Sequence, residues 1–138
     1  MGATAKSTRR TDSRKQRRQQ LIVAKIKCIA RKGMGSTSIG DVAKEAGLSQ
    51  GIVNLHFESK ENLLNDTLAS IANDYKSRFE AELKKPRPDA ASKLLALMQL
   101  DLKPSVLDRR KLAVWFAFWG EVKSRPRYRN ICKQMDEY

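Results

Sequence analysis

The residue types that most often perform catalysis or bind metals are scarce in this chain of 138 residues. It has a single histidine, His56, and two widely separated cysteines, Cys28 and Cys132. One histidine cannot form a histidine-based metal cluster, and this cysteine spacing fits neither a disulfide framework nor a zinc site. The sequence also shows no glycine-rich phosphate loop and no carboxylate pair placed for one apolar pocket. It therefore predicts a protein that is not an enzyme and needs no metal or cofactor, in a reducing compartment.

The charged residues point instead to a polyanionic partner. The chain has 28 lysines and arginines against 15 acidic residues, a formal net charge of +13. Nucleic acid is the first partner that this excess favours, and an anionic membrane surface is the second. No stretch approaches the roughly 18 apolar residues that a membrane span needs. Because no export signal is present either, we expect a cytoplasmic protein.

Much of the positive charge lies at the start of the chain. Residues 1–20 hold seven basic residues and one acidic residue, and few of the others are apolar. Such a segment has little to bury, so we expect residues 1–13 to form a disordered basic arm. Arg14, Arg17 and Arg18 follow this arm and are predicted to bind phosphates.

Apolar residues recur at helical spacing in seven segments, and no segment alternates like a strand. The sequence therefore predicts an all-α fold. We expect the first helix to begin near Asp12 or Ser13 and to end at Gly33. The sixth helix opens near Asp108 and is apolar nearly all round, so we expect it to be buried. Pro126 suits the first turn of the seventh helix, whose apolar stripe includes Tyr128, Ile131, Cys132 and Met135.

The stretch from residue 38 to residue 60 has the form of a helix-turn-helix. Ser38 and Asp41 predict a capping box at the start of one short helix, and Ser49 caps the next. Ala43 is small enough for the two helices to cross closely, and Gly47 permits a left-handed turn between them. Val53 then fills the space between the helices. This arrangement projects the second helix outward, where it can enter a DNA major groove.

At its end this stretch carries His56-Phe57-Glu58-Ser59-Lys60 and runs into a long helix. In these features it resembles the TetR family of bacterial transcriptional regulators, over roughly residues 17–68. A second segment, residues 111–119 followed by Arg125-Pro126-Arg127-Tyr128, resembles the ligand-binding domain of the choline-responsive, BetI-like subfamily. The resemblance implies a helix-turn-helix DNA-binding domain over 14–60 and a helical ligand-binding and dimerisation domain over 61–138.

The resemblance also implies roles for individual residues. Asn54 would bond an adenine edge or reach a phosphate, and Leu55 would pack on the DNA backbone or a thymine methyl group. His56 would bond a phosphate or cap its helix internally. The remaining residues that the resemblance assigns to DNA contact, to base edges or to phosphates, are Gln50, Gly51, Ile52, Thr37, Ser38, Ser49 and Lys60.

By the same resemblance the protein is expected to be a repressor that a small effector releases from genes for choline and glycine betaine metabolism. Trp115, Phe118 and Trp119 would line a pocket for a choline-like cation, or would be ordinary core residues. Family members end in two further helices that build a dimer interface, and this chain is expected to be incomplete there. The expected partners are a palindromic duplex and a second copy of the chain, without a membrane. The alternative is a basic helical protein that binds RNA or an anionic membrane.

Overall fold

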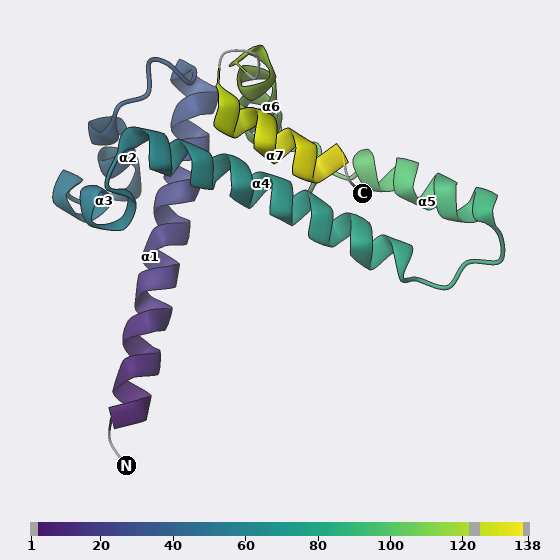
Figure 1. Cartoon of the computed structure of the whole chain (residues 1–138), viewed down its shortest axis with the longest axis horizontal. Helices are drawn as coiled ribbons and strands as arrows, with labels where there is room; N and C mark the ends of the chain where they lie inside the picture. The colour runs from purple at the N-terminus through teal and green to yellow at the C-terminus, as the bar shows by residue number, and fades with distance from the viewer. Residues whose placement is uncertain (1–2, 122–124, 137–138) are drawn as a thin grey trace. The chain divides into compact units, whose positions relative to one another are not determined.

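The computed structural model describes residues 3–121 and 125–136, which form helices and connecting turns without a strand (Figure 1). The predicted all-α fold is confirmed for this part of the chain. Seven helices are described in it: α1 (Ala3–Lys32), α2 (Ile39–Ala46), α3 (Gln50–Phe57), α4 (Lys60–Leu83), α5 (Ala90–Asp101), α6 (Arg109–Glu121) and α7 (Pro126–Asp136). None of these described helices is both long and apolar enough to cross a lipid bilayer.

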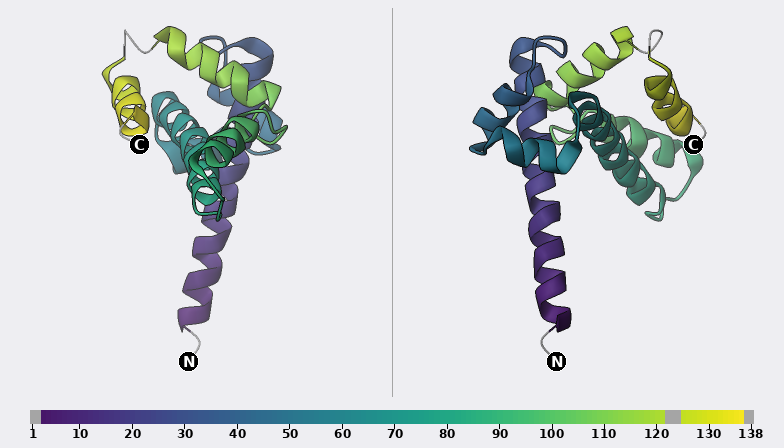
Figure 2. Two further views of the ribbon diagram at one scale, coloured as in Figure 1. Left: turned by 90° about the vertical axis from the view of Figure 1, so that its right-hand side faces the viewer. Right: turned by 60° about the vertical axis from the view of Figure 1, so that its left-hand side comes forward.

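The first helix is longer than the sequence predicts. α1 begins at Ala3, so the prediction that residues 1–13 are disordered is wrong from residue 3 onward, and residues 1–2 lie outside the described part. The physical reason is that alanine, arginine, lysine and glutamine are good helix formers. Extending a helix that already exists costs much less than starting one. The N-terminal half of α1 extends beyond α2 and α3 in both views of Figure 2.

The chain divides into two compact units, residues 1–67 and residues 68–138. The first unit continues past the predicted boundary at residue 60 and includes the first turns of α4. Its core is contributed by all four of its helices: Leu21, Ile22, Ala24 and Cys28 of α1, Val42 and Ala43 of α2, Val53 and Phe57 of α3, and Leu63 of α4. This shared core holds α2 and α3 against the C-terminal half of α1.

In the second unit, α6 buries only one of its faces. Val114 and Phe118 are buried, whereas Phe116 is 65% and Trp119 58% exposed. The prediction that the whole helix is buried is therefore wrong. The ring of Phe118 packs 5.0 Å from that of Tyr128 in α7, measured between centroids. Hydrophobicity alone does not determine which side of an apolar helix finds a partner, and here α7 supplies that partner.

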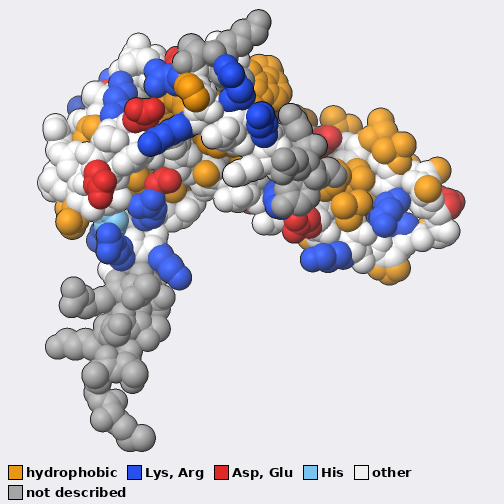
Figure 3. Space-filling view, in the orientation of Figure 1, with side chains coloured by type: hydrophobic (Ala, Val, Ile, Leu, Met, Phe, Trp, Pro, Cys, Tyr) orange, Lys and Arg blue, Asp and Glu red, His pale blue; other side chains and the backbone are white. Residues whose placement is uncertain are grey.

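Other predictions for the second unit hold at the helix ends. Pro126 is the first residue of α7, and Asp108 accepts bonds from the first backbone amides of α6. The side chain of Met135, in the predicted stripe of α7, lies outside the described residues. Apolar side chains gather on the surface of this unit over α5 (Figure 3), where the exposed residues are Leu94, Leu95, Met98 and Leu102.

Candidate nucleic-acid interface

The turn between α2 and α3 has the predicted helix-turn-helix geometry. Ser38 accepts a bond from the Asp41 amide, and the Asp41 carboxylate accepts one from the Ser38 amide, which completes the capping box. Gly47 is left-handed at φ 66°, and its neighbour Leu48 donates its amide to the Ala43 carbonyl at 2.9 Å. These local bonds set the direction in which the chain enters α3.

The capping box is reinforced by charge. Lys32 donates to the Asp41 carboxylate, and this bond, together with those from Ser38, holds the pKa of Asp41 well below its usual range. Asp41 therefore stays ionised at any pH near neutrality, which suits the positive end of the α2 dipole. The cap is an integral part of the turn and leaves the Ser38 hydroxyl engaged with Asp41.

One side of α3 is anchored and the other faces outward. Val53 and Phe57 are buried in the core of the first unit, and Ser49 caps the helix by accepting from the Ile52 amide. The outward side holds the predicted base-contacting residues. Gln50, Gly51, Asn54 and Leu55 are exposed, with Leu55 at 73%, and Ile52 is half-buried.

Gly40 of α2 supports this outward face, and no sequence pattern singles this residue out. A Cβ at Gly40 would lie 3.0 Å from the side-chain nitrogen of Gln50. The missing side chain therefore leaves room for the Gln50 amide across the start of α2. Only the tertiary structure reveals this approach, because the two residues lie on different helices.

Of the residues predicted to contact phosphates, Lys60 is accessible to DNA and the side chain of Thr37 is not. Lys60 is exposed at the first position of α4, and its ammonium donates to the Gly35 carbonyl at 3.2 Å. Thr37 is fully buried, and its hydroxyl donates to the Gly33 carbonyl at 2.7 Å. The Thr37 side chain thus stabilises the turn before α2 and does not reach the surface.

The three arginines of α1 also differ. Arg14 and Arg17 are exposed, and Arg17 donates to the side chain of Gln20 one turn further on. Arg18 instead ties three helices of the first unit together. It donates to the His56 carbonyl at 2.8 Å and pairs with Asp66 of α4. Its guanidinium also lies 4.5 Å from the Phe57 ring centroid.

His56 is half-buried between these arginines and the rest of α3. Burial, followed by the positive charges of Arg14, Arg18 and Arg17, lowers the pKa of His56 below its usual value of 6.5. Its buried Nδ1 has no hydrogen-bond partner among the described residues, so the predicted internal cap by the ring is not formed. At neutral pH the ring is uncharged, and one of its nitrogens can still donate a hydrogen bond.

In the second unit, the three aromatic residues predicted to hold a ligand lie on α6. Phe118 is buried, and the rings of Trp115 and Phe118 meet edge to face at 5.8 Å. The Trp119 ring lies 6.1 Å from that of Trp115 and is largely exposed. The three rings therefore form one cluster in which only Phe118 belongs to the core.

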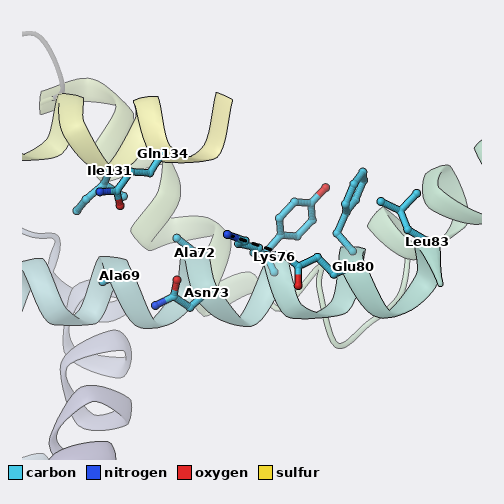
Figure 4. A pocket seen from close by; sticks show the side chains of 10 residues that line it. Ala69, Ala72, Asn73, Lys76, Glu80, Leu83, Ile131 and Gln134 are labelled. Carbon is cyan, nitrogen blue, oxygen red and sulfur yellow. Dashed lines mark ion pairs between the residues drawn. The ribbon is translucent and has the colours of Figure 1, made fainter. Parts of the chain in front are cut away.

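A cavity of about 440 Å³ lies between α4 and α7, apart from this cluster (Figure 4). Its polar wall includes Lys76 and Glu80, which form an ion pair at 3.8 Å. The Tyr75 and Phe79 rings, 6.3 Å apart, supply aromatic surface. The remaining lining residues are Ala69, Ala72, Asn73, Leu83, Ile131 and Gln134. The cavity is not predictable from the sequence, because the α4 residues that line it have the spacing of an ordinary apolar stripe on a long helix.

Tyr75 is fixed at the edge of this cavity. Its hydroxyl donates to Asp101 of α5 at 2.8 Å. Burial, and then this bond, raise the pKa of Tyr75 to about 12. The phenol therefore remains neutral at physiological pH and offers the cavity an aromatic ring of fixed orientation.

Comparison with known proteins gives a consistent match. Residues 21–67 match the family model described as "Bacterial regulatory proteins, tetR family". A relative from Paraburkholderia xenovorans (strain LB400), named HTH-type transcriptional regulator BetI, is 30% identical over 115 residues, which cover 83% of this chain and 59% of the relative. A relative of the same name from Stenotrophomonas maltophilia (strain R551-3) is 29% identical over 121 residues, covering 88% and 62%. The chain thus spans about three fifths of the length of these curated relatives.

A solved structure extends the match to both units. A candidate transcriptional regulator from Saccharomonospora viridis, determined in complex with choline, superposes with a TM-score of 0.78. The two sequences are 28% identical, and the superposition covers 89% of this chain and 64% of that chain.

Proposed function

Because residues 21–67 match the model of the tetR family of bacterial regulatory proteins, we propose that this chain belongs to that family and binds double-stranded DNA as a sequence-specific transcriptional regulator. The observation that carries the proposal is the outward face of α3. Gln50, Asn54 and Leu55 are exposed on a helix that Val53 and Phe57 anchor from behind. A helix held in this way can read base edges in a major groove about 12 Å wide.

Around this helix, the exposed basic residues are proposed to hold the DNA backbone. Lys60 stands at the start of α4 beside the turn that precedes α2, and Arg14 and Arg17 are exposed along α1. Phosphate contacts of this kind set orientation and affinity without reading sequence. Because the Thr37 hydroxyl is internal, its side chain is not part of the proposed interface.

A selection experiment tests this function. The purified chain is incubated with a pool of random duplexes, and the bound DNA is sequenced after several rounds. We expect a palindrome to be enriched, with two half-sites about 34 Å apart that two copies of the chain occupy. Single-stranded RNA and anionic vesicles at the same ionic strength serve as controls. Equal binding to RNA or vesicles, without enrichment of any duplex, would favour the alternative of a general polyanion-binding protein.

Substituting one phosphate-binding and one base-reading residue is expected to give different results. Lys60→Ala should weaken binding to all duplexes similarly and reduce the salt dependence of the affinity by about one phosphate equivalent. Asn54→Ala should leave the salt dependence unchanged and relax the preference for the selected sequence, by about 1–3 kcal/mol at one base pair. Salt titrations of both variants on selected and scrambled duplexes measure the salt dependence and the sequence preference. Identical behaviour of the two variants would contradict the assigned roles.

We propose further that a small cationic effector binds the second unit and releases the DNA. The choline complex of the Saccharomonospora viridis protein supports this effector class. The cavity between α4 and α7 offers the aromatic rings of Tyr75 and Phe79 and the carboxylate of Glu80. Such groups attract a quaternary ammonium ion through cation–π and Coulombic interactions. The α6 cluster of Trp115, Phe118 and Trp119 is the alternative site.

Titration calorimetry with choline distinguishes the two sites. Phe79→Leu keeps the cavity apolar but removes the ring, so choline affinity should fall about two- to thirtyfold if the contact contributes roughly 0.5–2 kcal/mol. Trp119→Leu, on the exposed side of α6, should leave the affinity unchanged. The reverse pattern would assign the effector to the α6 cluster.

A further inference from the structure

Lys25, in the middle of α1, is entirely buried. Its side chain is 0% exposed, and its ammonium nitrogen has no hydrogen-bond partner in the part of the chain that the structure describes. Burying a charged group without a partner is strongly unfavourable, so such lysines are rare in protein interiors. The proposed contacts with bases and phosphates make no use of this residue.

The charged neighbours of Lys25 do not compensate its charge. After burial itself, the largest effect comes from Lys60 of α4, which repels the Lys25 ammonium. Cys28 of α1 and Asp41 of α2 act in the opposite direction with smaller effects. The net effect, dominated by burial, lowers the pKa of Lys25 from 10.5 to about 8.

Neither of the two compensating groups is free to serve Lys25 better. The Asp41 carboxylate already accepts bonds from Lys32 and from Ser38. Burial raises the pKa of the Cys28 thiol, so the sulfur carries no charge at neutral pH. Asp41 is therefore the one ionised acid that acts on Lys25 among the described residues, and its carboxylate is already bonded elsewhere.

In the proposed DNA complex, one of these neighbours contacts the DNA. Lys60 is exposed and is the proposed ligand of a backbone phosphate. A phosphate on Lys60 offsets the repulsion that this residue exerts on Lys25 and brings a further negative charge towards it. The charged form of Lys25 is then stabilised in the complex relative to the free protein.

We propose that Lys25 takes up a proton when duplex DNA binds, because the phosphate held by Lys60 offsets this repulsion and brings a further negative charge towards Lys25. The inference rests on the proposed DNA-binding function. A group that gains a proton on binding makes the affinity fall as the pH rises. If the pKa of Lys25 rises from about 8 to about 9 in the complex, the affinity at pH 9 is roughly fivefold lower than at pH 7. His56 does not contribute, since its pKa lies below this range.

Titration calorimetry on the selected duplex measures the proton directly. The binding enthalpy is determined at pH 8.5 in two buffers of different ionisation enthalpy, whose difference gives the number of protons taken up. We expect about half a proton per chain for the unmodified protein. Lys25→Met, which keeps an unbranched side chain in the core, should bind DNA without this uptake. Lys93→Met, at an exposed lysine of α5, is the matched control and should retain it.

A further variant keeps the test independent of the folding of Lys25→Met. Lys60→Ala removes both the repulsion and the phosphate ligand, so its proton uptake should be clearly smaller than that of the unmodified protein. Absence of uptake in the unmodified protein, or equal uptake in Lys25→Met or Lys60→Ala, would overturn the inference. Absence of duplex binding at every pH would overturn the proposed function instead. The amino-terminal amine is the same in all variants. Differences in proton uptake between the variants therefore do not come from that amine.

Discussion

Replacing Gly47 by valine is expected to reduce operator affinity at least tenfold. Gly47 adopts φ 66°, a left-handed conformation that costs a β-branched residue about 1–2 kcal/mol or more. A Cβ at this position would meet nothing within 4 Å, so the cost comes from the backbone angle and not from crowding. To relieve this strain the turn must change, and α3 then leaves the direction that the groove requires. Fluorescence anisotropy on the selected duplex measures the loss.

Gly47→Asn is the matched control for this substitution. Asparagine tolerates the left-handed region, and the open space at residue 47 admits its side chain. We expect the asparagine variant to bind DNA within about threefold of the unmodified protein, since the left-handed conformation costs asparagine only about a few tenths of a kcal/mol. Undiminished binding by the valine variant would refute the view that this turn orients α3.

Arg18→Ala is expected to lower the free energy of unfolding of the first unit by about 2 kcal/mol. The substitution removes the bond to the His56 carbonyl, the ion pair with Asp66 and the contact with the Phe57 ring. A charge-assisted hydrogen bond contributes about 1.5–3 kcal/mol and a cation–π contact about 0.5–1. The side chains of the ion pair are 43% and 35% exposed, so the pair itself adds little. Urea denaturation followed by circular dichroism measures the change.

Arg17→Ala provides the comparison one position earlier. Arg17 is exposed and bonds only Gln20 among the described hydrogen bonds, so its loss should change stability by less than about 0.5 kcal/mol. It should instead reduce the salt dependence of DNA binding by about one phosphate equivalent. If Arg18→Ala left stability unchanged and altered only the salt dependence, Arg18 would be a DNA ligand like its neighbour and not a structural link.

The amino-acid sequence by itself determined the caps of α2 and α3 and the turn between these two helices. The capping box of Ser38 and Asp41, the left-handed Gly47 and the start of α7 at Pro126 are all found where the residue types predict them. These features are local, because each depends on hydrogen bonds or torsion angles within about four residues. The exposed face of α3 follows from the periodicity of an α-helix, once Val53 is assigned to the core.

The tertiary structure alone decided what each side chain contacts across helices. Arg17 and Arg18 are the same residue type in the same segment, yet only Arg18 meets Asp66 and Phe57. Likewise, α6 buries Val114 and Phe118 and leaves Trp119 outside, and Lys25 becomes an interior charge beside Lys60. The sequence carries no direct signal for these differences, because each depends on a partner many residues away. The burial of a side chain, and with it the energy of its charge, is set only when the helices pack.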